Sequence, residues 1–311
     1  MLRWHPAKKR LNKFAVPRLR RHVPALLLAC LGTAACSDEP LSNAAVMEAL
    51  EETDWRQPDQ GNLLYMRLPH GEIIIELAPG FAPENVANIK TLVRDQYFDN
   101  LAIIRSQDNY VVQWGDPAAD EDQARPLGSA AETVSPEFYR SANGINIAVI
   151  DSRDAYADVV GFANGLPVGS DSDRVWLTHC YGMLGVARGV ETDSGNGSSL
   201  YVVTGHAPRH LDRNITLAGR VLSGIENLTA LPRGTGALGF YESADERTTI
   251  VNIRLGDEIA KEDRLNIDVM RTDTAAFADY VQSRTYRHEE WFVDPTGRIE
   301  ICNINPPVRI N

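Results

Sequence analysis

Short apolar runs separated by turn residues dominate the middle of this chain and predict a mainly β domain over residues 62–257. Leu63 to Leu68 and Glu72 to Leu77 are the first two runs, and Pro69-His70-Gly71 between them is a typical turn. The second run alternates as a strand with one buried face does. These residues therefore predict a β-hairpin at the start of the domain.

A helix is expected soon after this hairpin. Pro83-Glu84-Asn85 is a favourable start, because proline is tolerated in the first turn and an acidic side chain there interacts well with the helix dipole. Apolar side chains then recur with helical spacing. The positions that share one face are Val86, Ile89, Leu92 and Val93.

A second hairpin is predicted around the polar patch Ser106-Gln107-Asp108-Asn109, which separates two apolar runs. Arg105 lies at the end of the first run, and Gln113 lies in the second. Their offset of eight residues is even, so both side chains lie on one face of the sheet if the turn keeps register. An arginine and an amide on an otherwise apolar face can bind a peptide carbonyl or a prolyl nitrogen.

Five segments of the chain, in the same order, resemble the cyclophilins, a family of peptidyl-prolyl isomerases. They are the strand and helix start from Gly71 to Ile89, the hairpin of Arg105 and Gln113, the strand from Gly182 to Arg188, the run from Asn196 to Tyr201, and His210 to Asn214 followed by Gly219-Arg220-Val221. The resemblance implies a mainly β fold, a closed eight-stranded barrel with flanking helices. Compared with that pattern, residues of about 118–178 are an insertion and residues 258–311 are a C-terminal extension.

The resemblance also implies roles for individual residues. The family arginine that matches Arg105 stabilises the twisted prolyl amide, and the glutamine that matches Gln113 holds the substrate backbone and orients the arginine. No metal or other cofactor takes part in this chemistry. The positions that match the family's substrate-binding surface are Tyr110, Val111, Arg188, Ser199, Tyr201, His210, Leu211 and Ile215.

Several residues differ from the family pattern around the conserved pair. Ile103-Ile104 replaces a phenylalanine-histidine, Val111 replaces a methionine, and His210 replaces a tryptophan. Tyr110 and Tyr201 replace aromatic residues that lack a hydroxyl. Two functions therefore remain open: a prolyl isomerase acting on exported proteins, and a weakly active or inactive peptide-binding module of the cell envelope.

Residues 1–36 have the features of an export signal. Residues 1–21 hold eight lysine and arginine residues and no acidic ones, and an apolar stretch from Val23 to Ala35 follows. This stretch is too short for a permanent membrane span. Small residues directly precede Cys36, as in a lipoprotein cleavage site whose cysteine becomes lipid-modified. Ordinary signal cleavage and an uncleaved anchor are the alternatives. With a lipid on Cys36, the protein would lie in the periplasm on the outer membrane, and residues 37–61 would form a tether with a short helix.

The chain of 311 residues is acidic, with a formal net charge of −11, and cleavage of the signal would remove only positive charge. Such a surface disfavours nucleic acid and anionic lipid. We therefore expect Pro-containing exported polypeptides as partners and membrane contact only through an N-terminal lipid. The oligomeric state does not follow from the sequence.

Cys180 and Cys302 are candidates for a disulfide, because an exported protein meets an oxidising compartment. Their distance does not follow from the sequence, so two buried free thiols remain the alternative. The extension that carries Cys302 predicts a helix from Ala275 to Arg287. It also predicts a hairpin from Trp291 to Cys302 around the turn Asp294-Pro295-Thr296-Gly297.

Other motifs do not meet the requirements of the sites they resemble. Pro208 between His206 and His210 disfavours the helix on which two zinc ligands would share a face. Gly234 to Gly239 matches a dinucleotide-binding glycine pattern without the strand and helix that pattern needs, so we expect a surface loop. The acidic residues of the insertion lack the spacing and glycine of a calcium loop; they are Asp151, Asp154 and Asp158.

Overall fold

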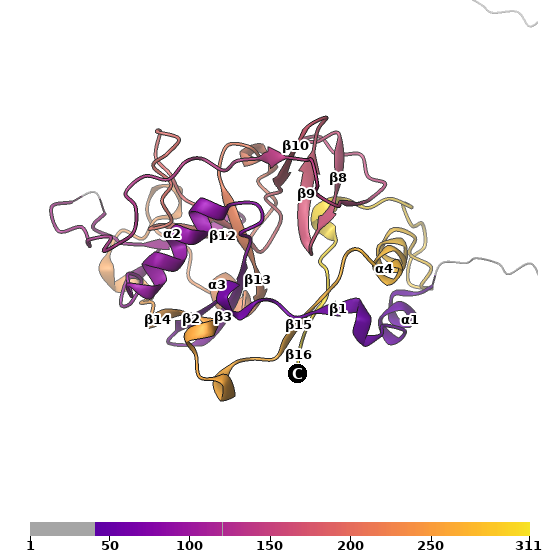
Figure 1. Ribbon diagram of the computed structural model, residues 1–311, viewed down its shortest axis with the longest axis horizontal. Helices are drawn as coiled ribbons and strands as arrows, with labels where there is room; N and C mark the ends of the chain where they lie inside the picture. The colour runs from indigo at the N-terminus through magenta and orange to yellow at the C-terminus, as the bar shows by residue number, and fades with distance from the viewer. Residues whose placement is uncertain (1–40, 120) are drawn as a thin grey trace, which may run out of the picture. The chain divides into compact units, whose positions relative to one another are not determined.

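The computed structural model describes residues 41–119 and 121–311, and Figure 1 shows how their helices and strands are arranged. Cys36 and the expected signal segment lie outside these residues. The helices of the described part are α1 Asn43–Glu48, α2 Pro83–Arg94, α3 Glu226–Thr229 and α4 Ala275–Thr285. None of these helices is long and apolar enough to cross a membrane.

The largest sheet has eight strands in the order β14-β2-β3-β13-β11-β12-β5-β4, and all neighbours are antiparallel. The first hairpin is β2 Leu63–Leu68 with β3 Gly71–Leu77, and the second is β4 Ala102–Ser106 with β5 Val111–Gly115. Both predicted hairpins are confirmed. The other strands are β11 Met183–Val186, β12 Leu200–Val203, β13 Leu217–Ser223 and β14 Asn252–Leu255.

The sheet is curled but open, so the prediction of a closed barrel is wrong. Its edge strands β4 and β14 do not pair with each other. The chain before β14 instead meets β4 in two isolated bridges, Ala102 with Thr249 and Arg105 with Phe240. Leu238 and Gly239 in this segment have positive φ angles, and such residues interrupt an extended strand. Irregular chain therefore occupies the place where a barrel would have continuous strand pairing.

The helix α2 lies against this sheet (Figure 1), and the side chains of the main hydrophobic core lie between them. The α2 residues predicted to share an apolar face are all buried. Side chains alternate along each strand, so Val112 and Val202 contribute to this core while Gln113 and Tyr201 point to the opposite face. The predicted catalytic pair thus lies outside the main core.

A second sheet falls within the predicted insertion, and its order is β6-β10-β9-β8-β7. The turn between β8 and β9 is Asn164-Gly165, and both residues have positive φ, as tight hairpin turns require. This sheet shares a hydrophobic core with α4 and α1. Its strands are β6 Arg140–Ser141, β7 Ala148–Val149, β8 Val159–Ala163, β9 Leu166–Ser170 and β10 Arg174–Leu177.

The two ends of the described chain meet in a third sheet of order β1-β15-β16, formed by Trp55–Arg56, Ile267–Met270 and Val308–Ile310. Val46 of α1 is buried in the core that contains Phe277 of α4. Residues 43–56, which we expected to belong to a tether, are therefore folded against the C-terminal extension.

The extension differs from its prediction in one element. The helix α4 forms as expected, but residues 286–300 contain no strand, so the predicted hairpin is wrong. Trp291 and Val293 are 81% and 98% exposed, whereas Ile301 is fully buried in the second core. The first strand of the expected hairpin is therefore largely exposed and not part of a sheet. The second expected strand ends in a short 3₁₀ helix, Ile301–Asn303, which packs into the second core.

The disulfide alternative is confirmed, because Cys180 and Cys302 are bonded to each other. Cys180 directly precedes the turn into β11, and Cys302 lies in the 3₁₀ helix of the extension. The bond closes a loop with a sequence separation of 122 residues and joins the extension to the main sheet.

Candidate active site

A row of four register partners crosses the main sheet from its edge. Arg105 on β4 pairs with Gln113 on β5, Gln113 pairs with Tyr201 on β12, and Tyr201 pairs with Gly185 on β11. Directly paired residues present their side chains on the same face of a sheet. The row therefore places a guanidinium, an amide and an aromatic ring side by side.

Arg105 is half-buried, and three side-chain bonds fix its guanidinium. Its Nε donates to the carbonyl oxygen of Leu238 at 2.7 Å, and its Nη1 donates to Gln113 Oε1 at 3.3 Å. Its Nη2 donates to Gln107 Oε1. An arginine has five N–H donors, so two remain for a substrate.

Aromatic rings flank the same guanidinium. The ring centroids of Tyr110 and Phe240 lie 5.5 and 5.2 Å from the guanidinium carbon of Arg105, within the range of cation–π attraction. Burial lowers the pKa of Arg105, and the neighbouring Tyr110 opposes this effect. An arginine remains charged at neutral pH after such a shift, and a partly desolvated charge acts more strongly on a nearby dipole.

Gln113 connects the arginine to the next strand. Its Nε2 donates to Ser199 Oγ at 3.0 Å, and Ser199 Oγ donates to the backbone oxygen of Trp114 at 3.2 Å. These bonds fix the orientation of the amide, so its oxygen faces Arg105. Of the predicted site residues, Arg105, Gln113 and Ser199 thus form one hydrogen-bonded chain.

Apolar residues beside this chain form an outer apolar cluster, separate from the main core. Its buried members are Val111, Tyr201 and Val203, and its half-buried members are Tyr110, Ala187 and Ile215. The cluster brings together four of the predicted substrate-binding positions. The half-buried side chains remain accessible to a peptide, so the cluster suits the apolar ring of a proline.

The other predicted substrate-binding residues lie differently. Leu211 is half-buried, and His210 is exposed. The side chain of Arg188 donates to the carbonyl oxygens of Asn214, Gly189 and Val190 at 2.8–3.1 Å. Arg188 therefore stabilises two loops with three of its side-chain donors.

Several residues around Arg105 were missed in the sequence. Leu238 belongs to the glycine-rich segment expected to be a surface loop, and Phe240 directly follows that segment. Gln107 belongs to the polar patch of the second hairpin. A side chain at Gly239 would overlap the Gln107 backbone, which explains the glycine there. No local sequence pattern indicated that this loop lies close to β4.

No group of three or more His, Cys, Asp or Glu side chains is arranged to hold a metal ion within the described residues. A cavity of about 580 Å³ lies away from the row and is lined by Arg56, Glu76 and Arg140 among others. Glu76 is already bound by Arg56 there, at 2.6 and 2.9 Å. We assign the candidate chemistry to the row because it joins two remaining guanidinium donors of Arg105 to an accessible apolar cluster.

Comparisons with known proteins agree with this geometry. The model of the cyclophilin type peptidyl-prolyl cis-trans isomerase/CLD family matches residues 63–255. A probable peptidyl-prolyl cis-trans isomerase of Brucella suis is 24% identical over 180 residues, which are 58% of this chain and 76% of that protein. The peptidyl-prolyl cis-trans isomerase-like 1 of Gibberella zeae is 25% identical over 188 residues, which are 60% of this chain and 91% of that protein.

A solved structure shares the fold over a longer part of the chain. The cyclophilin AquaCyp293 from Hirschia baltica superimposes with a TM-score of 0.66 and 24% identity, covering 82% of this chain and 93% of that one. The curled antiparallel sheet and its paired arginine and glutamine define a cyclophilin fold. Since the family model matches well over half of its length, this chain belongs to the cyclophilin-type peptidyl-prolyl cis-trans isomerases.

Proposed function

We propose that Arg105 and Gln113 catalyse prolyl isomerisation in extended segments of exported proteins. Rotation about an amide bond has a barrier of about 18–20 kcal/mol, because the C–N bond has partial double-bond character. In the twisted state the prolyl nitrogen becomes pyramidal and carries a localised lone pair. A hydrogen bond to that lone pair stabilises the twisted state more than either planar form, and only such differential binding accelerates the reaction.

The observation that carries this proposal is the orientation of the Arg105 guanidinium. Leu238, Gln107 and Gln113 each take one donor, so the two remaining N–H groups have fixed directions next to the outer apolar cluster. A preorganised charged donor needs no reorganisation when the amide twists. Gln113, held by Ser199, is placed to bind the substrate backbone. The mechanism requires no covalent intermediate.

A weakly active peptide-binding module is the second candidate. It is favoured by the engagement of Arg105 Nε with Leu238 and by the aromatic rings on both sides of the guanidinium. A protease-coupled assay of a prolyl peptide, performed with residues 37–311, separates the two functions. Catalysed exchange supports the isomerase, whereas peptide binding without catalysed exchange supports the module.

We further infer that the substrates are exported polypeptides and that the protein is anchored to the outer membrane by a lipid on Cys36. The basic segment, the apolar stretch and the small residues before Cys36 support this inference. The disulfide between Cys180 and Cys302 is consistent with an oxidising compartment, where such bonds persist.

A further inference from the structure

The hydroxyl of Tyr201 is hydrogen-bonded to a network of buried polar side chains behind the outer apolar cluster, and this network is the anchor of the ring. Tyr201 Oη lies 2.9 Å from His179 Nε2, and His179 Nδ1 lies 2.8 Å from Asp212 Oδ1. A carboxylate only accepts hydrogen bonds, so this network assigns the ring proton to Nδ1. Burial lowers the pKa of His179 and favours the neutral ring, whose free Nε2 then accepts the hydrogen bond from Tyr201. The tyrosine is thus fixed at both ends, by its backbone in β12 and by its hydroxyl.

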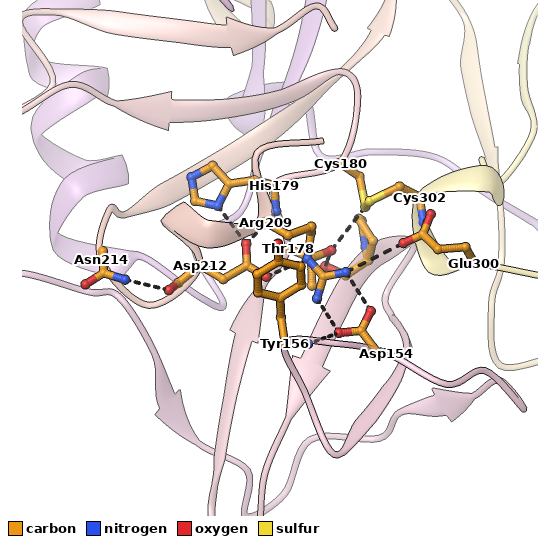
Figure 2. A network of polar contacts seen from close by, with 11 residues as sticks. Asp154, Tyr156, Thr178, His179, Cys180, Arg209, Asp212, Asn214, Glu300 and Cys302 are labelled. Atoms are coloured by element: carbon orange, nitrogen blue, oxygen red, sulfur yellow. Dashed lines mark hydrogen bonds and ion pairs between the residues drawn. A yellow bond between two sulfur atoms is a disulfide. The ribbon is translucent and has the colours of Figure 1, made fainter. Parts of the chain in front are cut away.

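The anchor continues through buried charges that are all paired, as Figure 2 shows. Arg209 Nε donates to Asp212 Oδ2 at 2.6 Å, and its two terminal nitrogens donate to Asp154 at 2.7 and 3.0 Å. The side chains of Asp212, Arg209 and Asp154 are between 2% and 5% exposed. Separating one partner from such a network leaves an uncompensated buried charge, which is strongly unfavourable. The positions of these side chains are therefore tightly constrained.

The network joins the two appended parts of the chain to the site. Asp154 belongs to the insertion, between β7 and β8. Glu300 of the extension lies 3.7 Å from Arg209 and accepts the backbone N–H of Cys302 at 2.9 Å. Cys302 is bonded to Cys180, the residue after His179. The contacts therefore close a ring (Figure 2). Its member His179 forms the hydrogen bond to Tyr201.

Gly185 supplies the second constraint on Tyr201. The two residues are register partners, and a side chain at position 185 would overlap the tyrosine ring. The ring thus lies directly on the backbone of β11. The location of the ring therefore depends on the absence of a side chain at Gly185 and on the hydrogen bond to His179.

We propose that His179, Asp212 and Arg209 are positioning residues that hold Tyr201 against Gly185, so that the insertion supports the prolyl-binding surface through Asp154. The effect on substrate binding rests on the proposed function, whereas the effect on the ring does not. The buried ring packs beneath the accessible side chains of the outer apolar cluster. Those side chains would contact the proline equally in the planar and twisted states, so the position of the ring affects ground-state and transition-state binding alike. Loss of such uniform binding raises KM and leaves kcat nearly unchanged.

Steady-state kinetics of the full mature chain test this proposal. Tyr201→Phe and His179→Gln should each raise KM about threefold to tenfold, as expected for one net hydrogen bond, with kcat within about twofold of wild type. The double variant should show no further increase, because both substitutions remove the same bond. Additive effects, an unchanged KM in both single variants, or a loss confined to kcat would overturn the proposal.

The insertion provides a matched pair of variants. Asp154→Asn removes one charge from the network and should raise KM in the same way. Asp158→Asn removes one charge from an exposed position of the same segment and should leave KM unchanged. Equal KM values for these two variants would show that the insertion does not support the site.

A spectroscopic measurement tests the ring directly, without turnover. Nuclear Overhauser contacts between the Tyr201 ring and the Gly185 Hα protons should be strong in the wild type and weakened in folded His179→Gln protein. Undiminished contacts would refute the positioning role. If the wild type proves inactive, the proposed function fails, and this measurement together with the Kd of a prolyl peptide still decides the positioning role.

Discussion

Arg105 and Gln113 are direct register partners on β4 and β5, and the guanidinium donates to the amide oxygen at 3.3 Å. A β-bulge between Ile103 and Arg105 shifts the register at this point of the edge strand. Bulges re-aim side chains and are frequent near active sites. The bulge therefore sets the direction of the arginine relative to the outer apolar cluster.

Replacement of Arg105 should separate catalysis from stability. Arg105→Ala should reduce kcat/KM by about 10²–10³, the usual loss when one preorganised donor is removed. Arg105→Lys should reduce kcat/KM as well. An ammonium group lacks the planar guanidinium that donates to Leu238, Gln107 and Gln113 at the same time. The protease-coupled assay measures both variants, and thermal unfolding should show little change.

Arg67→Ala is the matched control, since Arg67 is a largely exposed arginine on β2. It should retain the activity of the wild type. Equal, measurable activity of the wild type and Arg105→Ala would contradict the proposed catalytic role.

The elements that the sequence predicted are those with local signals. The even offset between Arg105 and Gln113 and the turn residues between them predicted the hairpin and its shared face, which is confirmed. The apolar face of α2 was predicted for the same reason. The roles of these residues in catalysis remain predictions.

The features that the sequence did not predict depend on contacts between distant segments. The carbonyl oxygen of Leu238 accepts a hydrogen bond from Arg105 over a sequence separation of 133 residues. No sequence pattern near either residue predicts this contact. From the sequence, Asp154 was considered only as a calcium ligand. Its ion pair with Arg209 was not predicted, because 55 residues separate the two in the chain. The closed barrel was expected from the resemblance, but closure depends on how the irregular chain before β14 runs beside β4.

The disulfide should contribute strongly to stability. Replacing Cys180 and Cys302 together by serine should lower the free energy of unfolding by roughly 4–5 kcal/mol, the loop-closure value for a bridge that spans more than a hundred residues. Urea unfolding of the wild type and the double variant measures the difference. Peptide mapping without reductant should recover the linked pair, and two alkylatable thiols in the denatured, unreduced protein would contradict the bond.

Two neighbouring arginines should respond oppositely to replacement by methionine. Burial lowers the pKa of Arg220 to about 10, and two of its guanidinium nitrogens have no hydrogen-bond partner among the described residues. A depression of this size corresponds to roughly 3 kcal/mol of destabilisation wherever the folded protein keeps the charge, below about pH 10. Arg220→Met should therefore leave the free energy of unfolding at pH 7 unchanged or raise it by about 1–3 kcal/mol.

Arg56→Met provides the contrast, because Arg56 binds the carboxylate of Glu76 with two hydrogen bonds. Its loss leaves a nearly buried carboxylate without that partner and should destabilise the protein by about 3–5 kcal/mol. Chemical unfolding at pH 7 measures both variants. A strong destabilisation by Arg220→Met would contradict this expectation and would mean that attraction to the Glu76 carboxylate outweighs the cost of burying the charge.

Export should leave a defined mature N-terminus. Mass spectrometry of the protein from membranes should find a lipid-modified Cys36 as the first residue. Cys36→Ser is the matched variant and should lose the lipid and the membrane association. A free N-terminus at another residue would contradict the lipoprotein, and retention of Met1 would contradict cleavage of a signal.

The neutral state of His179 should make stability depend on pH. Burial is the main cause of its lowered pKa, partly opposed by the hydrogen bond and charge of Asp212. Above the pKa of about 6.5 that a histidine has in the unfolded chain, neither state binds the proton, so this residue contributes no pH dependence. Below that pH the unfolded state binds the proton first, so the free energy of unfolding falls as the pH decreases, by at most about 1.4 kcal/mol per pH unit. Unfolding measured between pH 5 and 8 should show this decrease in the wild type and a smaller one in His179→Gln, whatever the absolute stability of the variant. Parallel pH profiles for the two proteins would mean that folding does not shift the pKa of His179, and would contradict the neutral ring between Tyr201 and Asp212.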